Sequence, residues 1–216
     1  MPGVEPLSDQ ILRENREVLD RMVGHRFVRD IKADRLPKAV FERYLVYEAS
    51  FVDTAIDIFA LATAKAGTIS QKRRLISVLD ALANEQVAYF ERTFEALGIE
   101  SGRFDLDVPG VRAFRHGMLE IARDGTFLDI VAAMFAAEWM YWTWCSAAAA
   151  CPISDPFLKQ WVDLHADEGF AAQALWLRQQ LDEAGEGLSA AERARLSAVF
   201  DRAQRLEIDF HEAAYG

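Results

Sequence analysis

Glu138 is the side chain of this sequence that most needs a chemical explanation. Between Ile130 and Ser154 it is the only charged residue, and its neighbours are Trp, Tyr, Phe, Met and Ala. A carboxylate in apolar surroundings is costly unless a hydrogen bond, a counter-charge or protonation compensates for the lost water. No neighbour in this segment can neutralise it. The partner of Glu138 must therefore come from another helix or from a ligand.

Two further carboxylates, Glu48 and Glu207, also lie on apolar stripes with helical spacing. Three expected helices thus each aim a carboxylate inward, and their convergence would create an acidic pocket with aromatic walls. Buried carboxylates suit general acid–base catalysis. The alternative for Glu48 and Glu207 is a place at the edge of the stripe or a pairing with Arg. The stripes contain Phe41, Tyr44, Leu45, Phe51, Val52, Ala55, Ile56 and Phe59 around Glu48; Val131, Met134, Tyr141 and Cys145 around Glu138; and Leu196, Val199, Ala203, Phe210 and Ala214 around Glu207.

The aromatic residues around Glu138 have two interpretations. Trp139, Tyr141, Trp142 and Trp144 form either an ordinary aromatic core or the wall of a pocket. The sequence contains no Gly-x-Ser-x-Gly motif, no Gly-rich phosphate loop and no Cys/His zinc spacing, so these chemistries are not expected.

The two cysteines, Cys145 and Cys151, are six residues apart in one hydrophobic stretch. On a helix they point to different faces, which disfavours a disulfide. Neither has an adjacent His or Lys to activate it, so both are expected to be inert core thiols. A reducing, cytoplasmic compartment is the simpler interpretation.

A di-iron site is the competing interpretation of the acidic residues. His165 and Glu168 are three residues apart, and Glu207 and His211 are four apart, so each pair could share a helix face with Glu48 or Glu138 as a further ligand. The inward Glu-x-x-His pair of such sites is missing, however. Asp163 and Asp167 also make the region of His165 look like a solvated face. We therefore expect no metal and no other cofactor.

Composition narrows the possible partners. Of the 216 residues, 51% are hydrophobic and 27% charged, the net charge is −10 and the isoelectric point is about 4.9. Such acidity argues against nucleic acid and against an anionic membrane surface as partners. The segment 130–154 is long enough to cross a membrane, but Asp129 and Asp155 flank it, so a buried helix is expected. The start, "MPGVEPLSDQ", lacks the features of a signal peptide.

The spacing of caps and breakers predicts one all-α domain of about seven helices over residues 1–216, with no strand and no repeat. The predicted helices are Ser8 to about Val23, Pro37 to about Gly67, Ser70 to Gly98, Asp107 and Pro109 to Gly125, Thr126 and Asp129 to about Cys151, Ser154 and Pro156 to about Gly185, and Ser189 with Glu192 to the end.

Three segments in order carry a resemblance to a known family. They are "HRFVRDIKADRLPKAVFERYLVYE", "AFRHGMLEIARDGTFLDIVAAMFAAEWMY" and "RLEIDFHEAAY". Together they resemble the TenA family of thiamin-pyrimidine salvage enzymes, over nearly the whole chain. The resemblance implies a heme-oxygenase-like helical bundle.

The resemblance also suggests a branch of the family. The classical branch carries a nucleophilic Cys in a Pro-Cys motif, and here Ala137 stands at that position after Ala136. The Cys-less branch carries an Ala-x-Glu-x-x-Tyr segment, which "AAEWMY" matches at Glu138 and Tyr141. The chain therefore resembles the Cys-less branch, and thiaminase chemistry through a covalent thioether is not expected.

Site residues carried over from the family are expectations for this chain. Glu48 corresponds to the pyrimidine-binding Asp and Glu207 to the catalytic Glu. Phe51, Phe114 and His165 stand where the classical branch has Tyr. The resemblance therefore implies Glu138, Glu207 and Tyr141 as catalytic residues. It implies Glu48, Phe51, Phe114, Trp139 and His165 as substrate-binding residues.

The implied function is hydrolysis of 4-amino-5-aminomethyl-2-methylpyrimidine or its N-formyl derivative to the hydroxymethylpyrimidine, an aminopyrimidine aminohydrolase activity in a cytoplasmic homotetramer. Two alternatives stay open. One is a pyrimidine-binding or regulatory homologue without catalysis, because the Phe residues replace Tyr hydroxyls. The other is a di-iron oxidase on the same fold.

Overall fold

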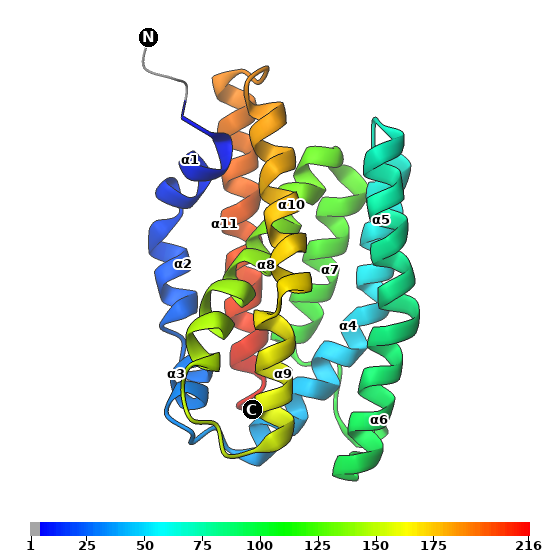
Figure 1. The fold of residues 1–216 in the computed structure, drawn as a ribbon, viewed down its shortest axis with the longest axis vertical. Coiled ribbons are helices and arrows are strands. Elements are labelled where there is room, and N and C mark those ends of the chain that lie inside the picture. Colours follow the sequence, from blue (N-terminus) through cyan, green and yellow to red (C-terminus); the bar gives the residue numbers. More distant parts are fainter. Residues whose placement is uncertain (1–4) are drawn as a thin grey trace. The chain divides into compact units, whose positions relative to one another are not determined.

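The computed structural model of the protein describes residues 5–216, and every regular element in that range is a helix (Figure 1). The predicted all-α class is confirmed. The first four residues of the predicted domain lie outside the described range. Contacts group the chain into two compact units: unit 1 comprises residues up to Leu36 and Val131–Ile208, and unit 2 comprises Pro37–Ile130 and Asp209–Gly216.

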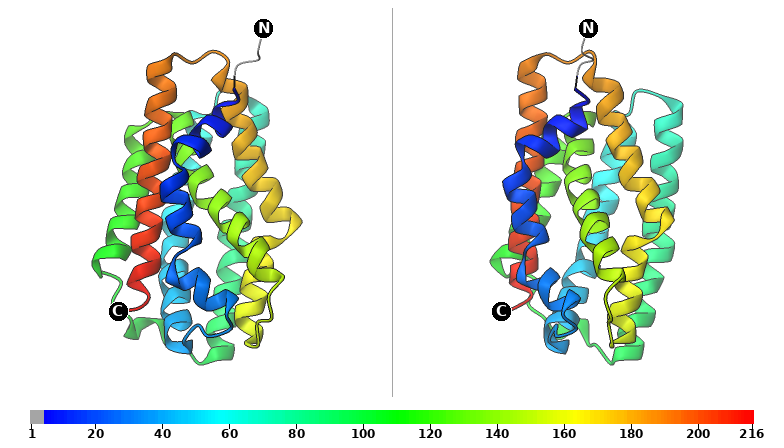
Figure 2. Two further views of the ribbon diagram at one scale, coloured as in Figure 1. Left: turned by 90° about the vertical axis from the view of Figure 1, so that its left-hand side faces the viewer. Right: turned by 60° about the vertical axis from the view of Figure 1, so that its left-hand side comes forward.

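Unit 1 is built from the N-terminal segment and from the long segment Val131–Ile208. Its helices are α1 (Leu7–Glu14), α2 (Arg16–Val23), α3 (Arg26–Lys32), most of α8 (Phe127–Ala149), α9 (Pro156–Ala166), α10 (Glu168–Gly185) and α11 (Ala190–Ala213) as far as Ile208. A short turn leads from α10 into α11, which runs back in the opposite direction (Figure 2).

Helix α1 is fixed to α10 by close packing and polar contacts. Asp182 accepts hydrogen bonds from the backbone N–H and the hydroxyl of Ser8, at 2.8 and 2.9 Å. Leu7 packs so closely on Gly185 that a Cβ built there would lie 2.7 Å from the Leu7 Cβ. Only glycine fits at position 185 without displacing α1.

Unit 2 is built around the longest helix, α4 (Lys38–Lys65), which lies beside α5 (Ile69–Ala81) and α7 (Pro109–Asp124) (Figure 1). A π-helical turn (Leu82–Gln86) joins α5 to α6 (Val87–Leu97), and a 3-10 turn (Ser101–Arg103) precedes α7. The start of α8 and the end of α11 complete the unit.

Lys65 ties α4 to the end of α7. Its ammonium donates to the backbone carbonyls of Ala122, Arg123 and Gly125, at 2.7, 2.9 and 2.5 Å. These carbonyls belong to the end of the helix, where no further turn can supply donors and the helix dipole is negative. One half-buried cation therefore satisfies the C-terminus of α7.

Eleven α-helices lie within residues 5–216, so the predicted number of about seven was too low. One extra helix, α3, follows His25, whose ring Nδ1 accepts from the N–H of Phe27 at 3.2 Å. Another break falls at Asn15, which separates α1 from α2 and whose amide donates to the Ile11 carbonyl. Histidine is not a common cap, which is why the sequence did not reveal α3.

Two other predicted helices are also divided. The helix predicted over Ser70–Gly98 is interrupted by the π-helical turn. The helix predicted over Ser154–Gly185 stops at Asp167, whose carboxylate accepts from the N–H of Phe170 at 2.7 Å and so caps α10. The Asp167 side chain thus takes the place of a backbone acceptor, and the helix ends there instead of continuing.

Several predicted helix ends are confirmed. Thr126 with Asp129 and Ser189 with Glu192 form reciprocal capping boxes. Gly98 ends α6 with a left-handed φ of 67°, a conformation that glycine adopts without strain.

Helices α7 and α9 begin at Pro109 and Pro156, as predicted, but four of the predicted capping residues were wrong. Thr68 and not Ser70 caps α5, and Asp155 and not Ser154 caps α9. Helices α1 and α7 begin after Pro6 and Val108, without any side-chain cap. Ser8 bonds Asp182 instead, which is a tertiary contact that no local pattern reveals.

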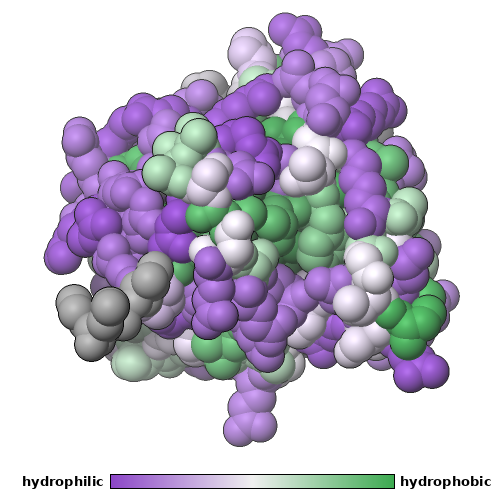
Figure 3. Space-filling view, turned by 90° about the horizontal axis from the view of Figure 1, so that it is seen from above, coloured by the Kyte–Doolittle hydropathy of each residue, from purple (hydrophilic) through white to green (hydrophobic). Residues whose placement is uncertain are grey.

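Hydrophilic residues cover most of the face seen from above (Figure 3). Among residues 5–216, no helix combines the length and the hydropathy that a membrane crossing requires. Helix α8 instead supplies unit 1 with buried core residues such as Phe135, Met140 and Trp144.

Candidate active site

The eight side chains predicted for the site come from both units, and each group is described within its own unit. Unit 1 holds Glu138, Trp139 and Tyr141 on α8, His165 on α9 and Glu207 on α11; unit 2 holds Glu48 and Phe51 on α4 and Phe114 on α7.

Tyr141 and His165 lie together in unit 1. Their ring centroids are 5.2 Å apart, and both rings pack against Trp161, at 6.1 and 4.2 Å. The Nδ1 of His165 is 2.8 Å from the Trp161 carbonyl oxygen. A carbonyl can only accept, so Nδ1 carries a proton and Nε2 is the basic nitrogen of the neutral ring. The Tyr141 phenol on α8 and the His165 imidazole on α9, whose tautomer is fixed, thus lie side by side.

Glu138 precedes Tyr141 by three residues on α8, so the two side chains share a helix face. The Glu138 side chain is half-buried rather than fully enclosed. Sequence reasoning expected a fully buried helix over this segment, and at Glu138 and the following two aromatic positions the helix is partly open.

Glu207 is buried, with 1% of its surface exposed. It lies three residues after Gln204, which is also buried and whose amide donates to the Ala136 carbonyl of α8 at 2.5 Å. The Gln204 bond therefore fixes the part of α11 that carries Glu207 to the part of α8 that carries Glu138.

Trp139 lies in a different aromatic group from Tyr141. Its ring is 5.3 Å from Phe135 and 5.2 Å from Trp142, and the Arg178 guanidinium lies 5.3 Å from its centre. Arg178 is held in turn by the hydroxyl of Ser8 at 3.0 Å. The predicted role of Trp139 as a pocket wall stays a prediction.

Phe51 and Phe114 of unit 2 pack against each other with ring centroids 4.5 Å apart. A third ring, Phe210, lies 4.7 Å from Phe114. Sequence reasoning placed Phe210 only on an apolar stripe, although its position three residues after Glu207 was the available signal. The three rings form an aromatic row that includes both predicted pyrimidine-stacking residues.

Glu48 is half-buried and lies one helical turn before Phe51 on α4. Tyr89 of α6 is its neighbour, which sequence reasoning missed. Burial raises the pKa of Tyr89 well above its ordinary value of 10, and the negative charge of Glu48 raises it further. Tyr89 follows the π-helical turn, a feature often found at functional sites and invisible in the residue pattern.

The residues of the di-iron alternative are arranged differently from the expectation. Helix α9 ends at Ala166 and Asp167 caps α10, so His165 and Glu168 do not share a helix face. Across residues 5–216, no group of three or more His, Cys, Asp or Glu side chains is arranged to hold a metal ion. Cys145 and Cys151 are free thiols, as predicted; Cys145 is buried, but Cys151 is only half-buried, so its predicted place in the core was wrong.

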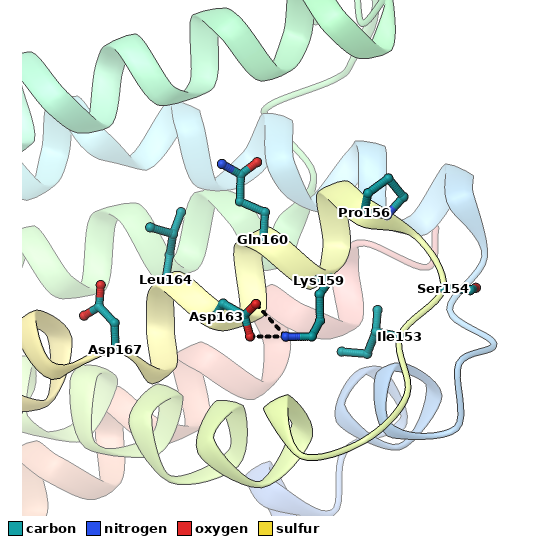
Figure 4. A pocket seen from close by; sticks show the side chains of 8 residues that line it. All are labelled: Ile153, Ser154, Pro156, Lys159, Gln160, Asp163, Leu164 and Asp167. Atoms are coloured by element: carbon teal, nitrogen blue, oxygen red, sulfur yellow. Dashed lines mark hydrogen bonds and ion pairs between the residues drawn. The ribbon is translucent and has the colours of Figure 1, made fainter.

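A shallow groove of about 620 Å³ runs along α9 and the segment before it (Figure 4). Lys159 in this groove is paired with both carboxylate oxygens of Asp163, one turn further along the helix. The groove contains none of the predicted site residues, and its cation is already neutralised. It is a solvated surface rather than a continuation of the site.

The described residues define an all-α protein with carboxylates set among aromatic side chains. The chain belongs to the TENA/THI-4/PQQC family, whose sequence model matches residues 12–216.

Three relatives show how similar the chain is to characterised proteins. It is 30% identical to an aminopyrimidine aminohydrolase of Halalkalibacterium halodurans over 196 residues, covering 89% of this chain and 88% of that protein. The protein of the same name in Helicobacter pylori is 20% identical and covers 97% and 98% of the two chains. That of Bacillus subtilis is 21% identical and covers 88% and 82%.

Solved structures show that the fold is TenA-like. A TenA homologue from Pyrococcus furiosus matches with a TM-score of 0.86 at 22% identity, covering 97% of this chain and 100% of that one. A protein described as a TenA family transcription regulator from a Silicibacter species matches with a TM-score of 0.86 at 24% identity, covering 96% of both chains.

Proposed function

We propose that this protein is an aminopyrimidine aminohydrolase of the Cys-less TenA type. Its substrate is 4-amino-5-aminomethyl-2-methylpyrimidine or the N-formyl derivative, and its product is the hydroxymethylpyrimidine. The observation that supports this most is the 30% identity over 89% of the chain to a relative with that activity in its name. The carboxylates at positions 48, 138 and 207 supply acid–base groups for such a reaction.

Substrate recognition is assigned to unit 2 residues. The Glu48 carboxylate accepts from the exocyclic amine of the pyrimidine and pairs with a protonated ring nitrogen, since charge-assisted bonds of this kind are strong and directional. Phe51 and Phe114 offer ring faces for stacking and lack the hydroxyls of the classical branch. Glu48 therefore recognises the polar groups of the pyrimidine, and the two Phe residues recognise its flat ring. Trp139 of unit 1 is proposed as a further wall.

The chemistry is assigned to unit 1 residues. Hydrolysis of the amine breaks the bond between the methylene carbon and the amine nitrogen, forms a bond from that carbon to a water oxygen, and releases ammonia. The N-formyl derivative first loses its formyl group as formate to another water molecule, which leaves the same amine. Glu138 takes a proton from the attacking water, and Glu207 gives one to the leaving amine. Tyr141 hydrogen-bonds one of the carboxylates, and the basic nitrogen of His165 contacts the substrate or relays a proton.

Ala137 argues against a reaction that uses a cysteine nucleophile. The side chain at this position is a methyl group that is 7% exposed, so no thiolate is present there to attack the pyrimidine methylene carbon. The proposed reaction is therefore direct attack by water without a covalent enzyme intermediate, and thiamin is not a substrate.

We further propose that residues 1–216 act as one TenA-like domain in a cytoplasmic homotetramer. The free thiols Cys145 and Cys151 suit a reducing compartment. Sedimentation of the purified protein at several concentrations tests the assembly, and a stable monomer would contradict it.

The test of the proposed function is ammonia release from the aminomethylpyrimidine, its N-formyl derivative and thiamin, each with and without added iron. We expect release from the amine or the formylamine, none from thiamin, and no change with iron. Tight pyrimidine binding without ammonia would favour a binding or regulatory protein. Iron-dependent oxygen consumption would favour the di-iron alternative.

A further inference from the structure

A recess of about 850 Å³ in unit 2 contains none of the eight predicted site residues. Its volume is in the range of small-molecule sites. Four segments of unit 2 surround it: α4, the loop before α7, the first turn of α7 and the end of α11. The lining residues used below are Arg43, Tyr47, Arg103, Phe104, Gly110 and Asp209.

Tyr47 is the most informative residue of the recess. Only 3% of it is exposed, and its ring packs at 6.4 Å from Phe210. Within the described part of the chain its hydroxyl makes no hydrogen bond, and the hydroxyl oxygen is not buried but accessible from the recess that the residue lines. Burial raises the pKa of Tyr47 above 10, so the hydroxyl is a donor at neutral pH. An external acceptor in the recess would satisfy it.

Arg43 supplies positive charge beside this hydroxyl. It lies one helical turn before Tyr47 on α4, and one of its nitrogens, Nη1, donates to the Ala214 carbonyl at 2.5 Å. A guanidinium has five N–H donors, and Arg43 forms no ion pair with residues 5–216. The guanidinium is thus fixed by a neutral carbonyl, and its remaining N–H donors are available to a ligand.

The first turn of α7 adds backbone donors. Helix α7 has 16 residues and begins after Val108, whose side chain caps nothing. Gly110 in this turn lines the recess and has no room for a side chain, since a Cβ there would lie 2.4 Å from the Asp209 carbonyl oxygen. The N–H groups and the positive dipole end of a helix attract anions.

We propose that this recess binds a small organic anion, whose charged group is held by Arg43, the Tyr47 hydroxyl and the start of α7. Phe104 and the Tyr47 ring provide apolar surface for the body of the ligand. The site is separate from the proposed hydrolase chemistry and stands whether or not that proposal holds.

The acidic residues at the recess restrict the ligand further. Asp105, Asp209 and Glu212 also line it, and all three are exposed. The Asp105 carboxylate accepts a hydrogen bond from the backbone N–H of Asp107, at 2.8 Å. Carboxylates at the rim repel a polyanion, so the ligand carries one phosphate or one carboxylate and is not a nucleic acid.

The experiment is a titration of the full-length ¹⁵N-labelled protein with phenyl phosphate, benzoate, inorganic phosphate and benzylamine. We expect the Gly110 amide signal to shift with the aromatic anions, more weakly with inorganic phosphate, and not with benzylamine. Comparison of phenyl phosphate with benzoate identifies the preferred anionic group. No saturable shift with any anion, or stronger binding of benzylamine, would overturn the proposal.

Tyr47→Phe removes the hydroxyl alone and keeps the ring against Phe210. We expect binding of the preferred anion to weaken about tenfold, as for loss of one hydrogen bond to a charged group. Arg103 also lines the recess but is paired with Glu100 at 2.7 Å, so Arg103→Gln should weaken binding less, by at most about twofold. The matched control is Arg112→Gln, an exposed position of α7 outside the recess. Equal affinity of Tyr47→Phe and the parent protein would contradict the assigned role.

Discussion

The two units hold their candidate site residues by different means. In unit 2, Phe51, Phe114 and Phe210 pack in a row through ring contacts of 4.5 and 4.7 Å. In unit 1, polar groups are fixed one by one: His165 by the Trp161 carbonyl, and the segment of Glu207 by the Gln204 bond to α8.

Under the proposed function, this difference predicts which step of the reaction each unit serves. Stacked rings tolerate small displacements and contribute to ground-state binding, whereas proton transfer needs groups placed within hydrogen-bond reach. Under the proposed function, unit 2 variants should therefore change KM and unit 1 variants should change kcat. The division fails if both kinds of variant change the same constant.

The largest effect is expected for Glu138→Gln. The amide keeps the shape of the side chain and cannot accept a proton from water, so kcat for ammonia release should fall about 10²- to 10⁴-fold with little change in KM. Steady-state kinetics measure both constants. Glu95→Gln, at an exposed position of α6, is the control and should retain full activity. Unchanged kcat in Glu138→Gln would remove Glu138 from the mechanism.

Phe51→Leu tests the other half of the comparison. Loss of an aromatic pair with Phe114 and of stacking with the pyrimidine should raise KM roughly threefold to tenfold, with kcat nearly unchanged. The half-buried position makes Phe51 safer for folding than the buried Phe114. A fall in kcat at constant KM would show that the aromatic row positions the reacting atoms.

The sequence was sufficient for the helices but not for their breaks. Periodicity and capping boxes located α4, α8 and α11, because these depend on residues close in the sequence. The helix breaks depend on whether a side chain or the regular helical partner bonds the backbone. These breaks are at Asn15, at Asp167 and at the π-helical turn. A residue pattern does not contain that competition.

The site was predictable in its residue types more than in its neighbours. The Phe51–Phe114 pair and the Tyr141–His165 pair are contacts between helices that the pattern suggested only as inward-facing positions. Tyr89 and Phe210 were missed as neighbours, because the register of α6 depends on the π-helical turn and Phe210 read as ordinary core. The contact of Trp139 with Arg178 was equally unpredictable, since it depends on the packing of α10.

Lys65→Met should lower the free energy of unfolding by about 1–3 kcal/mol, because three carbonyls at the end of α7 lose a charged donor. Urea denaturation measures the change. The matched control is Lys72→Met on α5, a half-buried lysine without such bonds, which should change the free energy by less than about 0.5 kcal/mol. Equal effects of the two substitutions would show that the bonds of Lys65 contribute no net stability.

The smallest effect concerns the titration of Tyr89. The folded chain keeps the phenol proton above pH 10, whereas the unfolded chain releases it near pH 10, because burial and Glu48 disfavour the phenolate. This contribution to the free energy of unfolding is therefore fully present below pH 10 and is lost as the pH rises above that value. Tyr89→Phe should flatten the decline, and alkaline absorbance titration should show one fewer high-pKa tyrosine. Glu48→Gln should lower the pKa of Tyr89 without returning it to 10, since burial is the larger cause of the raised pKa. A return to 10 would show instead that the Glu48 charge, and not burial, is the main cause.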